Sequence, residues 1–302
     1  MASQGIRADR SGTVEMRRVA RQGILRARRM LSSHSLSDTT VHDARKEIRR
    51  SRAAVRLLRV ALGAARFRRE NARLRDAGRV LNEARDAKVL VTTLDSLRRC
   101  HPQLECDHAF EALSERLREQ QRASRRHLNS ATTPSIAVAR RTLEQTQFSA
   151  SRWPVGNGGW RTLGPAFKRL YAAGRVAARK SRSQSDEHQM HEWRKQVKYL
   201  RHALQVFAPL RPSKLKKQAR LARRLAESLG DGHDLALLRD SAVSSANDDP
   251  STLTPLLTAI DQRRRVLRQQ SLELADRVYQ ESPREIDKRL QRYWHRWRDQ
   301  SK

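Results

Sequence analysis

Apolar residues recur every three or four positions along most of the chain, with no sustained alternation of period two. This is the periodicity of amphipathic α-helices, whereas half-buried strands alternate strictly. The pattern predicts helices near 13–33, 40–62, 66–99, 104–128, 160–182, 186–208, 213–242, 252–281 and 284–298. Thr40 with Asp43 three residues on resembles a capping box at the start of one of them. The sequence therefore predicts an all-α protein.

The helical pattern weakens between residues 129 and 159, and Gly-Asn-Gly-Gly at 156–159 is the clearest break in the chain. Glycine and asparagine punctuate helices in this way. Four helices before the break and more after it predict two helical bundles. The expected division is a disordered N-terminus (1–12), a first bundle (13–130), a linker (131–159) and a second bundle (160–300).

Two segments half a chain apart repeat one another. VHDARKEIRRSRAAVRLL at 41–58 aligns with MHEWRKQVKYLRHALQVF at 190–207, so that His42 meets His191. A second echo follows in the same order, RVLNEARDAKVL at 79–90 against RRLAESLGDGHDL at 223–235. Two echoes in one order indicate that each half of the protein is a copy of one unit.

Basic residues in both copies lie on one face of a helix. The first copy has such residues at steps of three and four, at His42, Arg45, Arg49, Arg52 and Arg56, and the second at His191, Arg194, Lys198 and Arg201. These positions lie about 100° from the apolar stripe, because each directly follows a position of that stripe. Like charges so placed destabilise a helix, and an extended polyanion would compensate them. Two such faces turned toward each other would line one basic groove or channel.

Composition strengthens this expectation. The 302-residue chain has 64 Lys+Arg against 32 Asp+Glu, a formal net charge of +32, which repels the compact state unless anions are bound. Cys100 and Cys106 lack CxxC spacing and suggest a reducing compartment. The polar N-terminus has no signal core, and no run of about 18 apolar residues is present. We therefore expect a soluble, cytoplasmic protein with no membrane span.

The repeated segments resemble the two signature segments of the CHAD domain, the conserved histidine α-helical domain, and the resemblance extends over roughly 13–300. It implies two four-helix bundles related by a pseudo-twofold axis, with a basic central channel that binds inorganic polyphosphate, often at polyphosphate granules. Gly230 departs from the family pattern, which often has arginine before the acidic residue, here Asp231. Because no ExExK motif is found, the chain looks like a stand-alone member without a fused triphosphatase domain.

The resemblance assigns polyphosphate binding to basic residues of both halves. Those in the signature segments are His42, Arg45, Lys46, Arg49, Arg52, Arg56, His191, Arg194, Lys195, Lys198 and Arg201. Bases of the first helix of each half are further candidates, namely Arg17, Arg21, Arg28, Lys168 and Arg175. No catalytic residue, metal ligand or cofactor is expected, and the oligomeric state stays open.

Two other functions remain open. A nucleic-acid-binding protein would account for the positive charge. However, aromatic residues do not alternate with the basic residues of the chain, as they would in a surface on which nucleobases stack. A polyphosphate or triphosphate hydrolase would need carboxylates to hold Mg²⁺ beside the phosphates. Asp86 and Asp231 are candidates for that role, but their simpler interpretation is orienting nearby arginines. The sequence therefore favours a binding protein that is not an enzyme.

Overall fold

The computed structural model describes residues 5–33, 36–81, 83–106, 108–128, 134–183, 186–244 and 253–300. Side chains at 83–86, 105–106 and 124–128 lie outside the described part. The described residues form α-helices, two short 3-10 helices and their connections, with no strand among them. The all-α prediction is therefore confirmed.

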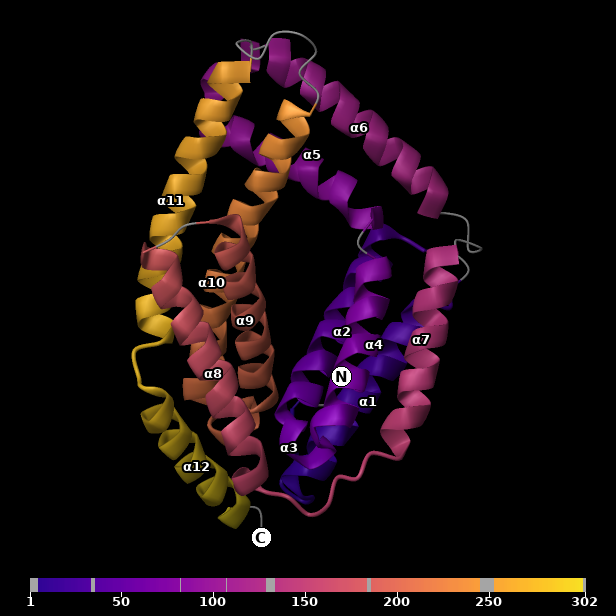
Figure 1. The fold of residues 1–302 in the computed structure, drawn as a ribbon, viewed down its shortest axis with the longest axis vertical. Helices are drawn as coiled ribbons and strands as arrows, with labels where there is room; N and C mark the ends of the chain where they lie inside the picture. The colour runs from indigo at the N-terminus through magenta and orange to yellow at the C-terminus, as the bar shows by residue number, and fades with distance from the viewer. Residues whose placement is uncertain are drawn as a thin grey trace.

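Twelve α-helices are described in two halves of the chain (Figure 1). The first half contains α1 (Gly12–Met30), α2 (Asp38–Leu57), α3 (Arg59–Leu62), α4 (Ala64–Val80), α5 (Glu83–Cys100), α6 (His108–Leu128) and α7 (Pro134–Ser151). The second half contains α8 (Trp160–Ser183), α9 (Glu187–Val206), α10 (Pro212–Val243), α11 (Thr254–Val278) and α12 (Pro283–Asp299). The 3-10 helices are η1 (Pro102–Cys106) and η2 (Ala208–Leu210).

The first bundle consists of α1, α2, α4 and α7. Helix α1 packs on α2 and α7, and α4 packs on the same two helices. Their buried side chains, such as Met16, Ile48 and Leu143, belong to the large hydrophobic core. Helix α7 occupies much of the interval 131–159 that we expected to be a linker, so this prediction is wrong for residues 134–151.

The second bundle is built around α9. Helices α8 and α10 pack on α9, while α12 covers α8 and α11 covers α10. Trp193 and Leu200 of α9 are fully buried here together with Phe167 of α8. Because these residues share one core with the first bundle, the two bundles are packed together.

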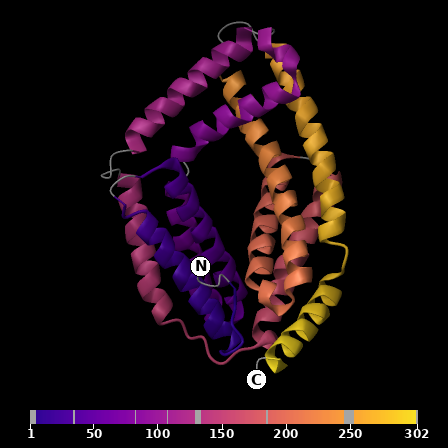
Figure 2. The same cartoon turned by 180° about the vertical axis from the view of Figure 1, so that it is seen from behind.

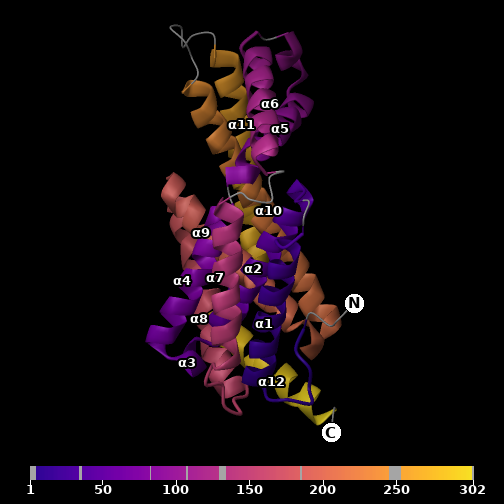
Figure 3. The same cartoon turned by 90° about the vertical axis from the view of Figure 1, so that its right-hand side faces the viewer.

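Helix α5 leaves the first bundle and crosses to the second half of the chain, and α6 packs on α5 and runs back toward the start of α7 (Figure 1). Leu94, Leu97 and Phe110 form a separate core with Leu238 of α10 and Ile260 of α11. Figure 3 shows α5, α6 and part of α11 together at one end of the elongated molecule. The expected helix 66–99 is thus two helices, of which α4 ends at Val80 and α5 begins at Glu83, and α5 packs on α10 and α11 of the other half of the chain. The pseudo-twofold relation between the bundles stays a prediction.

Two N-caps fix where the signature helices begin. The Ser37 hydroxyl accepts a hydrogen bond from the Thr40 amide at 3.1 Å, and the Asp186 carboxylate accepts one from the Gln189 amide at 2.7 Å. Such caps satisfy amides that have no partner inside the helix. The N-cap of α2 is therefore Ser37, and not Thr40 as the capping-box pattern suggested.

The N-terminal segment from residue 5 is packed against the second half of the chain. Ile6 is buried, and its amide donates to the Val206 carbonyl at 3.3 Å. The Arg7 amide donates to the Glu15 carboxylate at 2.9 Å. The prediction that residues 1–12 are disordered is therefore wrong from residue 5 onward, while residues 1–4 lie outside the described part.

Candidate functional site

Helices α2 and α9, which carry the two repeated basic segments, lie side by side. They pack directly on each other, and Figures 1 and 2 show them closest at their C-terminal ends and diverging toward α5. The α2 row is defined as His42, Arg45, Arg49, Arg52 and Arg56, and the α9 row as His191, Arg194, Lys198 and Arg201. Each row has an exposed histidine at its start, followed by bases that are half-buried.

The rows approach each other where α2 and α9 converge. The Arg56 guanidinium lies 3.8 Å from the centroid of the Tyr199 ring on α9, and that of Arg52 lies 5.4 Å from it. His202 of α9 is buried, and the nearby positive charges of Arg201 and Arg49 contribute to lowering its pKa after desolvation, the largest cause. Arginines of the two rows therefore belong to one continuous region.

Burial weakens the hydration of these guanidinium groups. Desolvation is the largest influence on Arg52 and on Arg201, and it lowers the pKa of both from the usual value. Arginine nevertheless remains charged in proteins. The Arg56 and Arg201 Nε atoms are buried without a hydrogen-bond acceptor among the described residues. Positive charge is thus concentrated in a partly dehydrated region, where an anionic ligand would be attracted more strongly than in water.

Helix α10 supplies histidine and carboxylate groups beside the α9 row. The His191 and His233 rings lie 5.3 Å apart. Desolvation, followed by the charge of Arg194, lowers the pKa of His233 to about 4, and desolvation with Lys195 lowers the pKa of His191. The Arg194 Nη2 lies 3.6 Å from Asp234 Oδ1. The α9 row is therefore partly compensated by its own half of the protein.

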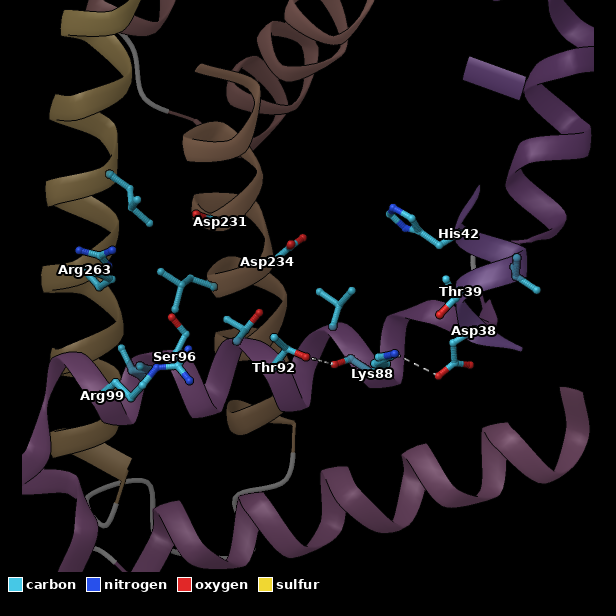
Figure 4. Close-up of a pocket in the computed structure, with 16 residues that line it drawn as sticks. Asp38, Thr39, His42, Lys88, Thr92, Ser96, Arg99, Asp231, Asp234 and Arg263 are labelled. Carbon is cyan, nitrogen blue, oxygen red and sulfur yellow. Dashed lines mark hydrogen bonds and ion pairs between the residues drawn. The ribbon is translucent and has the colours of Figure 1, made fainter. Parts of the chain in front are cut away.

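A cavity of about 500 Å³ lies where the two rows diverge (Figure 4). Its lining comes from the first turn of α2, from α5, α10 and α11. His42 and Asp234 reach into it from opposite sides. Lys88 of α5 is paired with Asp38 across 3.4 Å, and Arg263 of α11 also lines the cavity. The cavity has both signs of charge, in contrast to the rows that begin beside it.

The predicted site residues do not all lie in this region. Arg17 donates to the Trp153 carbonyl at 3.2 Å, and Arg28 donates to Glu144 of α7 at 3.1 Å. Both therefore contact α7 or the segment that follows it, and not α9. Arg175 lies close enough to Tyr171 and Glu285 to influence their pKa values.

The remaining candidates have simpler surroundings. Lys168 is half-buried on α8, and Arg21 and Lys46 are exposed. Lys195 forms an ion pair with Glu192 one turn earlier on α9. The side chain of Asp86 lies outside the described part, so its role in orienting arginines stays a prediction.

Sequence reasoning missed several residues of the site. Tyr199 aligns with Arg50 of the first copy and follows the basic row by one position, so the spacing of the row does not select it. Arg50 is itself buried and donates to Glu47 at 2.6 Å, while Arg26 donates to the same carboxylate at 2.7 Å. Tyr199 contacts arginines of α2, and Glu47 also binds Arg26 of α1, so these contacts join different helices and no spacing within one segment reveals them.

The described residues offer neither a membrane span nor a cluster of metal ligands. No helix among them is long and apolar enough to span a membrane. In the same part of the chain, no three or more histidine, cysteine, aspartate or glutamate side chains are grouped so that they could hold a metal ion. The Cys100 thiol is free and exposed.

Comparison with known proteins identifies the family. The family model of the CHAD domain matches residues 22–243, which is more than half of the 302-residue chain and includes both signature helices. No match was found among curated proteins. On the strength of the family match, and in agreement with the paired basic helices, the chain belongs to the CHAD domain family.

Proposed function

We propose that the protein binds inorganic polyphosphate along the α2 and α9 rows. The family is associated with polyphosphate and triphosphate binding. The observation that carries the proposal is the convergence of two half-buried basic rows at the contact of Arg56 with Tyr199. Like charges held this close repel one another unless a ligand supplies negative charge. A linear polymer of phosphates supplies it at regular intervals along both rows.

Arginine suits this ligand because its planar guanidinium donates to two phosphate oxygens at once. Affinity then comes from such contacts and from release of counterions condensed on the polymer. The proposal includes no chemical step, and the protein acts as a binder rather than an enzyme. Association with polyphosphate granules would follow from the same affinity.

The proposal is tested by titrating long-chain polyphosphate at several salt concentrations. Wild-type protein is expected to bind at moderate salt, with log affinity falling linearly with log salt. Charge reversal at Arg49, Arg52, Lys198 and Arg201 should abolish binding while circular dichroism shows unchanged helicity. Absence of wild-type binding at moderate salt would refute the proposal.

A matched control distinguishes the effect of the two rows on binding from the effect of the overall charge. Arg140, Arg141, Lys216 and Lys217 are exposed on α7 and on the start of α10. Reversing these four charges changes the net charge by the same amount as reversing the four row residues. Binding should weaken only modestly in this control. Equal weakening in both variants would mean that net charge alone attracts the polymer.

Nucleic acid and hydrolysis are tested in parallel. Tyr199 lies between arginines of the α2 row, but it is only 4% exposed and offers no open face on which a base could stack. Polyphosphate should therefore remain bound when single-stranded or duplex DNA is added at equal phosphate concentration. Phosphate release with and without Mg²⁺ measures hydrolysis, which is expected to stay at the background rate.

A further inference from the structure

Tyr199 is a buried aromatic ring at the contact between the two signature helices. It projects from α9, is 4% exposed, and has the Arg56 guanidinium 3.8 Å and the Arg52 guanidinium 5.4 Å from its centroid. The Arg52 Nε also donates to Asn71 of α4 at 3.4 Å. One side chain of the second half thus contacts two adjacent arginines of the first half.

Other buried arginines of this region are held by carboxylates. Glu47 binds both Arg50 and Arg26, and Asp234 pairs with Arg194. Each such carboxylate fixes a guanidinium but also cancels much of its charge. An aromatic ring attracts a cation through its quadrupole and has no net charge. A guanidinium held by Tyr199 is therefore fixed in place and keeps its full charge.

We propose that Tyr199 is a positioning residue that orders Arg52 and Arg56 for phosphate binding without neutralising them. This inference rests on the proposed polyphosphate-binding function. The ordering matters because a long arginine side chain loses rotamer freedom when it binds, and that cost lowers affinity. A side chain already held against a ring has given up that freedom before the ligand arrives.

The contact of a tyrosine ring with two arginines of the opposite row is not repeated at the aligned positions of the two copies. The residue aligned with Tyr199 in the first copy is Arg50, which is buried against Glu47. The residue aligned with Arg56 in the second copy is Gln205, which contacts His202 at 3.1 Å. The paired rows are therefore asymmetric, and the arginines that contact Tyr199 lie in the α2 row at the end where the rows converge.

Two variants distinguish the contribution of the Tyr199 ring to binding from that of its hydroxyl. Tyr199→Phe keeps the ring and should bind polyphosphate nearly as well as wild type. Tyr199→Leu removes the ring and should weaken binding by about threefold to thirtyfold, the range that one cation–π contact represents. Tyr199→Met, whose flexible side chain fills irregular gaps, is the second ring-less variant if the leucine variant does not fold.

A change in salt dependence distinguishes positioning from simple loosening of the helix packing. The slope of log affinity against log salt should decrease by about one for each phosphate that the protein no longer binds. Phe148→Leu is the matched control, since Phe148 holds Arg152 at 4.2 Å on the exposed side of α7. It removes the same type of interaction outside the α2 and α9 rows and should change neither affinity nor slope.

A double-mutant cycle completes the test. In an Arg52→Gln/Arg56→Gln background, Tyr199→Leu should have no further effect on binding, because Tyr199 acts through these arginines. Equally weakened binding in the phenylalanine and leucine variants, or an undiminished effect in that background, would overturn the inference. So would wild-type affinity and slope in a folded ring-less variant. Failure of wild-type protein to bind would instead refute the proposed function.

Discussion

Arg194 of α9 and Asp234 of α10 form an ion pair beside the cavity, with Nη2 3.6 Å from Oδ1 and side chains 11% and 16% exposed. The carboxylate fixes the guanidinium and also competes with phosphate for it. Asp234→Asn should therefore tighten polyphosphate binding by about two- to fivefold, in line with the small net energy of most such pairs. Titration at fixed salt measures this.

The control for this variant is Asp240→Asn, which removes an exposed carboxylate from the same helix. It changes the net charge identically and should alter affinity less. Weaker binding by Asp234→Asn, seen only when Mg²⁺ is present, would indicate that Asp234 holds a cation with the phosphate. That outcome would favour the hydrolase interpretation.

A second prediction compares Arg201 with Arg28. Arg201 belongs to the α9 row and has a buried Nε with no acceptor in the described part of the chain, whereas Arg28 is paired with Glu144 of α7. Arg201→Gln should weaken polyphosphate binding by about tenfold or more, as expected when a charged hydrogen bond is removed. Arg28→Gln should have less than about a twofold effect. Equal effects of the two substitutions would indicate that the basic residues of α1 also bind polyphosphate.

Most helices of the fold could be predicted because their apolar stripes are regular. The exception is α7, in which Ile136, Ala139 and Leu143 are buried at helical spacing while Val138 and Phe148 are 54% and 62% exposed. Exposed apolar residues blur the stripe from which a helix is recognised. The separation of α4 from α5 was likewise missed, since neither proline nor glycine lies at residues 81–82.

The sequence predicted which basic residues of the candidate site share a face of one helix, but not their contacts with other helices. Steps of three and four put the α2 row on one face whatever the tertiary structure. The partner of each basic side chain comes from another helix: Arg56 contacts Tyr199, Arg28 pairs with Glu144, and Arg194 pairs with Asp234. The crossing of α5 to α10 and α11 also could not be inferred from the repeat, because both halves have apolar faces of similar pattern.

A third prediction concerns the buried charges of Glu47 and Arg50, which are 7% and 4% exposed. Glu47→Gln leaves Arg50 and Arg26 without their carboxylate, and it should lower the free energy of unfolding by about 3–5 kcal/mol. Chemical denaturation measures the change. Glu111→Gln, which breaks the more exposed pair with Arg98, should cost less than about 1 kcal/mol.

Replacing both members of the buried pair is the informative companion to that experiment. Glu47→Met/Arg50→Met removes the charge along with its partner, and should be less destabilising than Glu47→Gln alone. Arg26 remains half-buried, so some destabilisation is still expected. A double variant as unstable as the single one would mean that the pair stabilises the fold through its own attraction.

The fourth prediction is that His202 makes the fold sensitive to acid. It is 4% exposed and packed near Arg201, Arg49 and Arg50, so that desolvation and then these charges lower its pKa to about 3. In the unfolded chain its pKa is near 6.5. Between these values the unfolded chain binds the extra proton, and stability falls by about 1.4 kcal/mol for each unit by which the pH is lowered. Above pH 6.5 the contribution is fully present.

The comparison that isolates this effect is His202→Gln, whose amide does not titrate. His233 also has a lowered pKa, of about 4, and contributes to the acid sensitivity of both proteins. The difference between the two unfolding free energies, measured by urea denaturation from about pH 7 to pH 4, should therefore change by about 1.4 kcal/mol per unit below about pH 6. Parallel curves would show that His202 has the same pKa in the folded protein as in the unfolded chain, and hence that it is less buried, and less close to Arg201 and Arg49, than the structure indicates.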